Sequence, residues 1–343
     1  MSYHTKTTHR RELFAILYPH RTLSQHEKSI TLRDQKKNGK EQPWKEKKIA
    51  SLDYAELLHI LEFNKASRVQ QCGTVLDFNV DHEGYLTLAH AWFCKSRLCQ
   101  ICNWRRAMKH SGQTKKIVAE VIRRKPKARW LFLTLTVKNV REGKELNQNL
   151  SDMARAFRKM IEYKKVAQNL VGFMRASEVT VNPKDHSYNQ HLHVLLCVDS
   201  TYFKDQENYI TQKQWTKFWQ KAMKLDYTPV VHVQAIKPKN RKKSDITSAV
   251  DETAKYPLKS TDYMTDDQDH NLQVVKDLEE GLRQKRLISY GGLLKEIHKE
   301  LHMDEVDDEE TDLIHTTEED EAEEIAYSIT AIWNWQKKNY IVK

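Results

Sequence analysis

The chain has 343 residues, of which 39% are hydrophobic and 30% charged, with a formal net charge of +10 and a mean hydropathy of -0.76. This length suits one large domain or two ordinary ones, and no apolar run approaches the roughly 18–20 residues that a membrane-spanning helix needs. The first residues also lack the apolar core of a secretory signal, so we expect a soluble, intracellular protein without a membrane partner.

Charge is distributed unevenly along the chain. Residues 95–129 contain twelve Lys or Arg and a single acid, Glu120, and the two tryptophans Trp104 and Trp130 are interleaved with this charge. Such a basic run favours a polyanion, with DNA or RNA as the first candidate. The alternative is a basic face that only meets water. Residues 304–324, with thirteen Asp or Glu and no Lys or Arg, predict a disordered or loosely held connector.

Hydrophobic periodicity predicts the elements in chain order. Residues 1–48 are polar and Lys-rich and predict a basic arm. Helical spacing predicts helices at 44–64, 109–124, 145–169, 211–224, 246–263 and 290–301. Apolar, β-branched segments predict strands at 130–137, 172–181, 191–198 and 229–236. Strands and helices that alternate without Gly-rich turns indicate an α+β fold, a sheet with helices packed on it.

Two histidines, His191 and His193, open the third of these strands. Side chains alternate between the faces of a strand, so both imidazoles should project to one side about 6–7 Å apart, where they could hold one cation. Glu178, on the preceding strand, is the candidate third ligand. One carboxylate and two imidazoles with open positions suit Mg²⁺ or Mn²⁺, and Mn²⁺ matches the nitrogens better. The alternative is a pair of surface histidines, since His-x-His alone is weak evidence.

The chain has five cysteines, and an odd number in an intracellular protein disfavours a disulfide framework. Cys94, Cys99 and Cys102 form a C-x4-C-x2-C pattern, and Cys72 could complete four thiolates around a structural Zn²⁺. The alternative is a set of buried free thiols. Cys197 lies in an apolar strand and is expected to be a core residue.

A zinc ion held by these thiolates would fix the loop that carries them. We expect the fixed loop to direct the basic side chains around it outward, toward DNA: Lys95, Arg97, Arg105 and Arg106.

A tyrosine with charged neighbours lies in the segment 251–264. In a helix, Glu252 would share a face with Tyr256, and Lys255 and Lys259 would flank the phenol. Pro257 disfavours helical geometry at Tyr256, so either the helix kinks there or Tyr256 stands at its edge. The alternative is a tyrosine that only packs against the core.

Five separated segments resemble, in the same order, the motifs of HUH-type rolling-circle replication initiators, and most closely the Rep family of small Gram-positive plasmids. The three central motifs are FLTLTV (132–137), EVTVNPKDHSYNQHLHVLLCV (178–198) and ETAKYPLKSTDYM (252–264). The other two are the Cys-rich element FCKSRLCQICNWRRA (93–107) and the C-terminal block GLRQKRLISYGGLLKEIHKEL (281–301). The resemblance covers roughly residues 68–301.

The resemblance implies a central antiparallel sheet, with the histidine strand near its middle, and strand-specific cleavage of plasmid origin DNA. By this resemblance His191 and His193 bind the cation and Tyr256 attacks the phosphodiester, giving a 5′-phosphotyrosine and a free 3′-OH. Glu252 would activate water at termination. A host helicase and a host DNA polymerase would be partners in the bacterial cytoplasm, and no nucleotide cofactor is needed.

The implied organisation has four parts: a basic arm with a short helix (1–67), a Cys-rich zinc element (68–110), a nicking domain with the C-terminal block (111–301), and an acidic tract with a terminal segment (302–343). Related chemistry could instead serve a relaxase or a transposase of a mobile element. From a different class, the chain could be a non-catalytic, zinc-dependent DNA-binding repressor.

Overall fold

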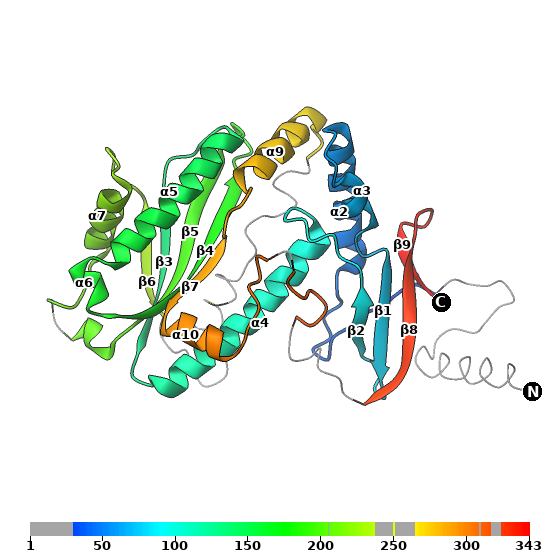
Figure 1. Ribbon diagram of the computed structural model, residues 1–343, viewed down its shortest axis with the longest axis horizontal. Coiled ribbons are helices and arrows are strands. Elements are labelled where there is room, and N and C mark those ends of the chain that lie inside the picture. Colours follow the sequence, from blue (N-terminus) through cyan, green and yellow to red (C-terminus); the bar gives the residue numbers. More distant parts are fainter. Residues whose placement is uncertain (1–29, 205, 237–249, 251–264, 309, 317–323) are drawn as a thin grey trace, which may run out of the picture. The chain divides into compact units, whose positions relative to one another are not determined.

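The computed structural model describes residues 30–204, 206–236, 250, 265–308, 310–316 and 324–343 (Figure 1). The chain divides into two compact units. One, the small-sheet unit, comprises Met1–Glu46, Gly73–Trp92 and Glu319–Lys343. The other, the large-sheet unit, comprises Lys47–Cys72 and Phe93–Glu318.

The small-sheet unit is built on four antiparallel strands in the order β2-β1-β8-β9. Their bounds are β1 Val75–Asp81, β2 Leu86–Ala91, β8 Ile325–Asn334 and β9 Asn339–Val342. In β1 every second residue is buried, at Leu76, Phe78 and Val80, as expected for a strand with one face on a core. The apolar C-terminal segment therefore forms the strands β8 and β9, which extend the sheet beside the β1–β2 hairpin. In the sequence, this hairpin lies within the expected Cys-rich element (68–110).

The large-sheet unit has five antiparallel strands in the order β6-β3-β5-β4-β7. Their bounds are β3 Arg129–Thr136, β4 Leu170–Val181, β5 Tyr188–Val198, β6 Val231–Ile236 and β7 Ile288–Gly292. The predicted antiparallel sheet with helices packed on it is confirmed, and the strand with both histidines, β5, is its middle strand.

One face of this sheet packs against α5 (Gly143–Ile161) and α7 (Gln212–Met223), with the short α6 (Lys164–Ala167) between them in sequence (Figure 1). The buried cluster on this face contains alternate residues of β3 and β5, including Leu133 and Leu192, together with Trp219 of α7. A further helix, α9 (Gln268–Gly281), packs against α5.

The opposite face packs against α4 (Gln100–Arg124) and α10 (Leu293–Glu300) (Figure 1). Ile117 and Val121 of α4 contact a cluster that includes Leu195 of β5. Helix α4 begins nine residues before the predicted start of its helix because the cysteine loop leads directly into it. Two more helices, α2 (Trp44–Ile60) and α3 (Ala66–Gln71), precede the cysteines. None of the described helices is long and apolar enough to span a bilayer.

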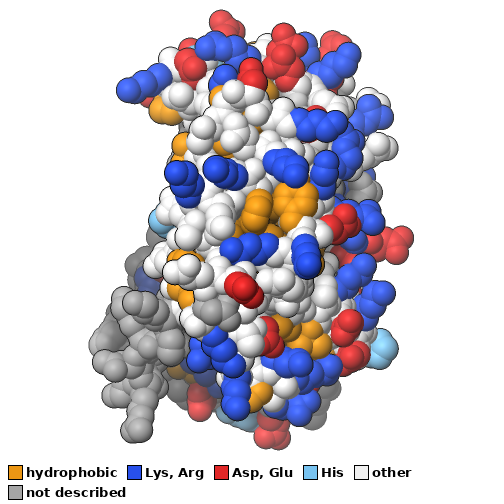
Figure 2. Space-filling model, turned by 90° about the vertical axis from the view of Figure 1, so that its left-hand side faces the viewer, with side chains coloured by type: hydrophobic (Ala, Val, Ile, Leu, Met, Phe, Trp, Pro, Cys, Tyr) orange, Lys and Arg blue, Asp and Glu red, His pale blue; other side chains and the backbone are white. Residues whose placement is uncertain are grey.

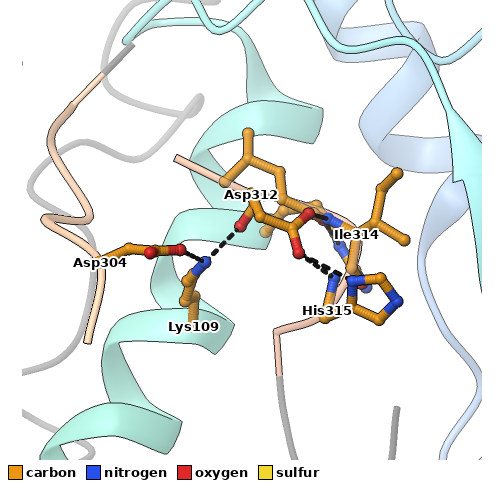
Figure 3. Close-up of polar contacts among 7 residues, drawn as sticks. Lys109, Asp304, Asp312, Ile314 and His315 are labelled. Atoms are coloured by element: carbon orange, nitrogen blue, oxygen red, sulfur yellow. Dashed lines mark hydrogen bonds and ion pairs between the residues drawn. The ribbon is translucent and has the colours of Figure 1, made fainter. Parts of the chain in front are cut away.

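Residues 304–308 and 310–316, here called the acidic strap, pack along α4 (Figure 3). Lys109 of α4 is 8% exposed at its side chain, forms an ion pair with Asp304 and donates to the Asp312 carbonyl at 2.7 Å. The Asp312 carboxylate closes the strap by accepting from the Ile314 backbone N–H at 2.7 Å and from His315 Nδ1 at 2.8 Å.

The strap also joins α4 to the sheet. Asp307 Oδ2 accepts the backbone N–H groups of Leu287 and Ile288 at 2.8 and 2.9 Å, at the start of β7. For this first part of the acidic run, the prediction of a loosely held connector is wrong. Local charge favoured solvation, but the buried Lys109 of α4 pairs with Asp304, and the backbone N–H groups at the start of β7 donate to Asp307.

Candidate metal centres

The register of the β4–β5 hairpin brings the predicted ligands together. Glu178 of β4 lies directly opposite His191 of β5, and Ala176 lies opposite His193. Glu178 is therefore the direct neighbour of one histidine and the diagonal neighbour of the other, on one face of the sheet. Leu192, between the histidines, points into the core on the other face.

The three side chains converge at their ligating atoms. Glu178 Oε2 lies 2.8 Å from His191 Nε2 and 2.6 Å from His193 Nε2, and the two imidazole rings are 4.7 Å apart and nearly perpendicular. Their side chains are 12%, 12% and 18% exposed for His191, His193 and Glu178, respectively. This group, here called the Glu-His-His triad, is thus partly open to solvent.

Neighbouring side chains hold the His193 ring. Phe132 stacks on it with a centroid separation of 5.5 Å, and Thr134 Oγ1 lies 3.4 Å from its Nδ1. Because Nδ1 is turned to the hydroxyl, Nε2 is directed toward Glu178 and available as a ligand atom. His191 Nδ1 has no hydrogen-bond partner among the described residues.

The triad suits a divalent cation. Burial alone would raise the pKa of Glu178, but hydrogen bonds from His191 and His193 outweigh it and hold that pKa well below its usual range. Glu178 is therefore an anionic ligand beside two nitrogen ligands. Metal bonds of about 2.1 Å at right angles place neighbouring ligand atoms about 3.0 Å apart. A small increase in the distances from Glu178 Oε2 to the two histidine Nε2 atoms would therefore admit Mn²⁺ or Mg²⁺.

Replacing Glu178 with Gln should weaken Mn²⁺ binding at least about tenfold, or about 1.4 kcal/mol, because the only anionic ligand of the triad is lost. Titration calorimetry or the electron paramagnetic resonance of free Mn²⁺ measures this affinity. Glu296→Gln on the exposed surface of α10 is the control and should bind as the parent does. An unchanged Mn²⁺ affinity in Glu178→Gln would remove Glu178 from the ligand set.

The four predicted zinc ligands also form a cluster. Cys72, Cys94, Cys99 and Cys102 are all buried, all free of disulfides, and offer sulfur atoms within 4.8 Å of one another. Cys102 Sγ lies 3.5 Å from Cys72 Sγ and 3.7 Å from Cys94 Sγ. Tetrahedral Zn²⁺ with bonds of about 2.3 Å places its sulfur atoms about 3.8 Å apart, so the spacing fits this ion.

Polar groups around the sulfurs favour thiolates. The backbone N–H of Cys94 donates to Cys72 Sγ at 3.3 Å, that of Lys95 donates to Cys102 Sγ at 3.2 Å, and Ser51 Oγ lies 3.4 Å from Cys99 Sγ. Burial raises the pKa of the Cys72 thiol, because a thiolate without a cation is poorly solvated there. A bound Zn²⁺ would remove this cost, and the four residues fit that role.

A buried lysine beside the cluster was not predicted. Lys48 of α2 is fully buried, and its Nζ donates to the carbonyls of Gln70 and Cys72 at 2.8 and 2.7 Å. Its positive charge opposes the net negative charge that four thiolates leave on a zinc site. In the sequence Lys48 is one of several lysines in a polar helix, so no local signal distinguishes it.

Replacing Lys48 with Met keeps the length of the side chain and removes its charge. We expect zinc release to a chelator to become at least about tenfold faster, because the tetrathiolate loses its buried counter-charge. A chromogenic chelator assay measures this rate. Lys45→Met, at an exposed position of the same helix, is the control, and equal release rates in both variants would contradict the role of Lys48.

The prediction that the arginines near the cysteines all point outward is wrong for two of them. Arg105 and Arg106 are 3% and 1% exposed. Arg105 Nε donates to the Leu313 carbonyl of the strap at 2.8 Å, and Arg106 Nη2 donates to the Lys95 carbonyl at 2.7 Å. Arg97 donates to the Leu282 carbonyl at 3.3 Å. These guanidinium groups satisfy backbone carbonyls within the protein, a use of arginine that charge counting cannot separate from DNA binding.

The predicted nucleophile and its neighbours, Glu252, Lys255, Tyr256 and Lys259, lie outside the described residues. The residue before this segment, Val250, is 1% exposed and packs in the cluster on the α4 side of the sheet. The Glu-His-His triad projects from the same side, since His193 and Leu195 of β5 share a face.

Comparison with known proteins shows which family the chain belongs to. A family model described as "Replication protein" matches residues 85–341. A "Replication protein" of Staphylococcus aureus is 66% identical over 236 residues, which cover 69% of this chain and 100% of that protein. A "Protein rep" of Lactiplantibacillus plantarum is 51% identical over 313 residues, covering 90% and 98%. A "Protein rep" of Streptococcus pneumoniae is 42% identical over 315 residues, covering 91% and 95%.

No solved structure matches the chain. The family model spans about three quarters of the sequence and includes the Glu-His-His triad and three of the four cysteines. The chain belongs to the Rep_1 replication-protein family, and its resemblance to the plasmid Rep initiators is confirmed.

Proposed function

We propose that this replication protein initiates rolling-circle replication by cutting one strand of plasmid origin DNA with a tyrosine. The observation that carries the proposal is the convergence of Glu178 of β4 with His191 and His193 of β5, the middle strand of an antiparallel sheet. Together with membership of a replication-protein family, this arrangement supports an HUH endonuclease fold.

In the proposed reaction Tyr256 is the nucleophile. Its Oη loses its proton and attacks the scissile phosphorus, the bond from phosphorus to the 3′ oxygen breaks, and that oxygen takes up a proton. The products are a 5′-phosphotyrosine and a free 3′-OH, so the phosphodiester bond energy is conserved and no nucleotide cofactor is needed. Lys255 and Lys259 would offset the negative charge of the phosphate.

The Glu-His-His triad would hold Mn²⁺ or Mg²⁺ close to the scissile phosphate. A divalent cation there supplies Lewis-acid polarisation of the phosphoryl oxygens. The protein's own contribution is to keep the three ligand atoms on two neighbouring strands, where the pleat and the Phe132 ring fix their positions.

Chain length supports the assignment of Tyr256. Val250 is buried on the triad side of the sheet, and Tyr256 follows it by six residues. Six residues span at most about 20–22 Å, so the chain is short enough to keep residue 256 within that distance of Val250.

The later steps assign roles to further groups. A host DNA polymerase would extend the 3′-OH, and a host helicase would unwind the duplex. Glu252 would activate a water molecule that hydrolyses the phosphotyrosine bond after one round of replication. Zn²⁺ held by Cys72, Cys94, Cys99 and Cys102 would have a structural role, fixing the loop from which α4 begins.

Supercoiled plasmid that carries the cognate origin tests the proposal. In the presence of Mn²⁺ the protein should convert this DNA to nicked and relaxed forms, while a plasmid without the origin stays supercoiled. A protein that shifts origin DNA in a gel but never relaxes it would be a DNA-binding repressor, and the proposed reaction would then be wrong.

A further inference from the structure

The solvent face of α7 carries a row of lysines. Lys213, Lys217, Lys221 and Lys224 are exposed at spacings of four, four and three residues, which place them along one side of the helix and its C-cap. The helix contains no acidic residue. Its opposite side is apolar, and Trp215 and Trp219 are buried there. We call these four residues the α7 lysine row.

The row carries unbalanced charge. Within the described part of the chain, Lys213, Lys217 and Lys221 form no ion pair, and Lys221 Nζ lies 5.6 Å from the centroid of the Tyr163 ring. Like charges four residues apart cost a helix about 0.2–0.5 kcal/mol for each pair. A row of this kind is stabilised by a polyanion that lies along it.

Further basic side chains extend this surface. Lys159 at the end of α5 and Lys164 of α6 are exposed as well, and the exposed Arg158 beside them pairs with Glu162 at 3.7 Å. Figure 2 shows Lys and Arg side chains spread widely over the side of the molecule that is at the left of Figure 1, where α7 lies. The surface therefore offers several cations to one ligand.

The row and the triad lie on opposite faces of the sheet, and α7 is hydrogen-bonded to the strand that pairs with His191. Trp219 Nε1 donates to the Thr136 carbonyl at 2.8 Å, and Thr136 is the β3 partner of His191. One residue of β3 thus joins the core side of α7 to the triad. DNA bound along the row would have a fixed position relative to the triad without covering it.

We propose that the α7 lysine row binds the phosphate backbone of duplex DNA that flanks the cut site. This inference rests on the proposed function for the choice of DNA as the polyanion. Four helical residues rise about 6 Å, close to two base steps of about 3.4 Å each, so successive lysines can meet phosphates of one strand. Lysines bind phosphate as point charges and read no bases, so the contact is independent of sequence.

The test is a variant in which Lys213, Lys217 and Lys221 are all replaced with Gln. Fluorescence anisotropy with a duplex oligonucleotide, over a series of salt concentrations, gives the slope of log K against log salt. Each lost phosphate contact should reduce the slope by about 0.9, so a reduction of about 2–3 is expected. The matched variant with Arg at the three positions keeps the charge and should keep the slope.

Cleavage of a short single-stranded oligonucleotide that carries the cut site is measured in parallel, and the Gln variant should cleave it at the parental rate. An unchanged duplex slope in a Gln variant with parental Tm would overturn the inference. Equal losses of duplex binding and oligonucleotide cleavage would also overturn it, because the row would then bind the scissile strand. If the parent protein cleaves no oligonucleotide, the proposed function is wrong. The difference in salt slope between the parent and the Gln variant still shows whether the α7 lysine row binds duplex DNA.

Discussion

Replacing Tyr256 with Phe should abolish nicking of supercoiled origin DNA, with a loss of at least about 10³-fold, or about 4 kcal/mol of activation free energy. Phenylalanine has no oxygen to form the phosphotyrosine bond, and nothing else in the proposed reaction replaces that step. Binding of origin DNA should stay close to that of the parent because only one hydroxyl is removed. Gel electrophoresis of the plasmid and anisotropy of a labelled origin duplex measure the two properties.

Tyr263→Phe is the matched control, since Tyr263 lies in the same segment and offers the same hydroxyl. It should nick the plasmid at the parental rate. If Tyr263→Phe is inactive and Tyr256→Phe is active, the nucleophile has been assigned to the wrong tyrosine.

Replacing Cys99 with Ser should remove zinc and destabilise the large-sheet unit. Structural zinc sites hold their ion with apparent free energies of about 10–16 kcal/mol in small peptides, comparable to the whole stability of a domain. Loss of even about 4 kcal/mol would lower Tm by roughly 8–16 °C for a unit of this size. Native mass spectrometry gives the zinc content, and thermal unfolding followed by circular dichroism gives Tm.

Cys197→Ala controls for loss of a buried thiol. Cys197 is as buried as the cluster cysteines but lies in β5, among the core residues on the α4 side of the sheet. This variant should keep one zinc ion per chain. A Cys99→Ser protein that retains a full zinc ion, with the affinity of the parent, would count against a four-thiolate site.

The Glu-His-His triad could be predicted because it depends on short-range geometry. The alternation of a strand puts His191 and His193 on one face whatever the rest of the chain does. Glu178 required the further assumption that the two strands are neighbours, which a hairpin of this length favours. The register that sets Glu178 opposite His191 comes from the hairpin turn and the buried faces, and is fixed only in the folded sheet.

Other features depend on contacts between residues far apart in sequence. β1 pairs with β8, about 250 residues later, so the small sheet has no local signature. Arg105 was predicted to face DNA because its charge is visible in the sequence, and Lys109 belongs to the same basic run. Their partners in the acidic strap are about 200 residues away in sequence. Lys48 is recognisable only when the cysteine loop folds beside it.

β7 was missed for a related reason. The segment 290–301 has helical spacing, and α10 indeed occupies most of it, but the chain first forms a short edge strand against β4. Gly292 ends that strand with φ +57°, and a side chain there would collide with the Val171 carbonyl, at 2.5 Å from the added Cβ. A glycine in this left-handed conformation separates strand from helix, a change of direction that periodicity does not detect.

The most direct measurement is the identity of the residue that becomes linked to DNA. The protein is incubated with Mn²⁺ and a single-stranded oligonucleotide spanning the cut site, digested with a protease, and the nucleotide-bearing peptide is sequenced by mass spectrometry. We predict a phosphodiester link from the 5′ end of the downstream fragment to the phenol at position 256, formed by the parent and lost when His191 and His193 are both replaced with Ala. A linkage at another residue, or an adduct that forms equally well without the two histidines, would contradict it.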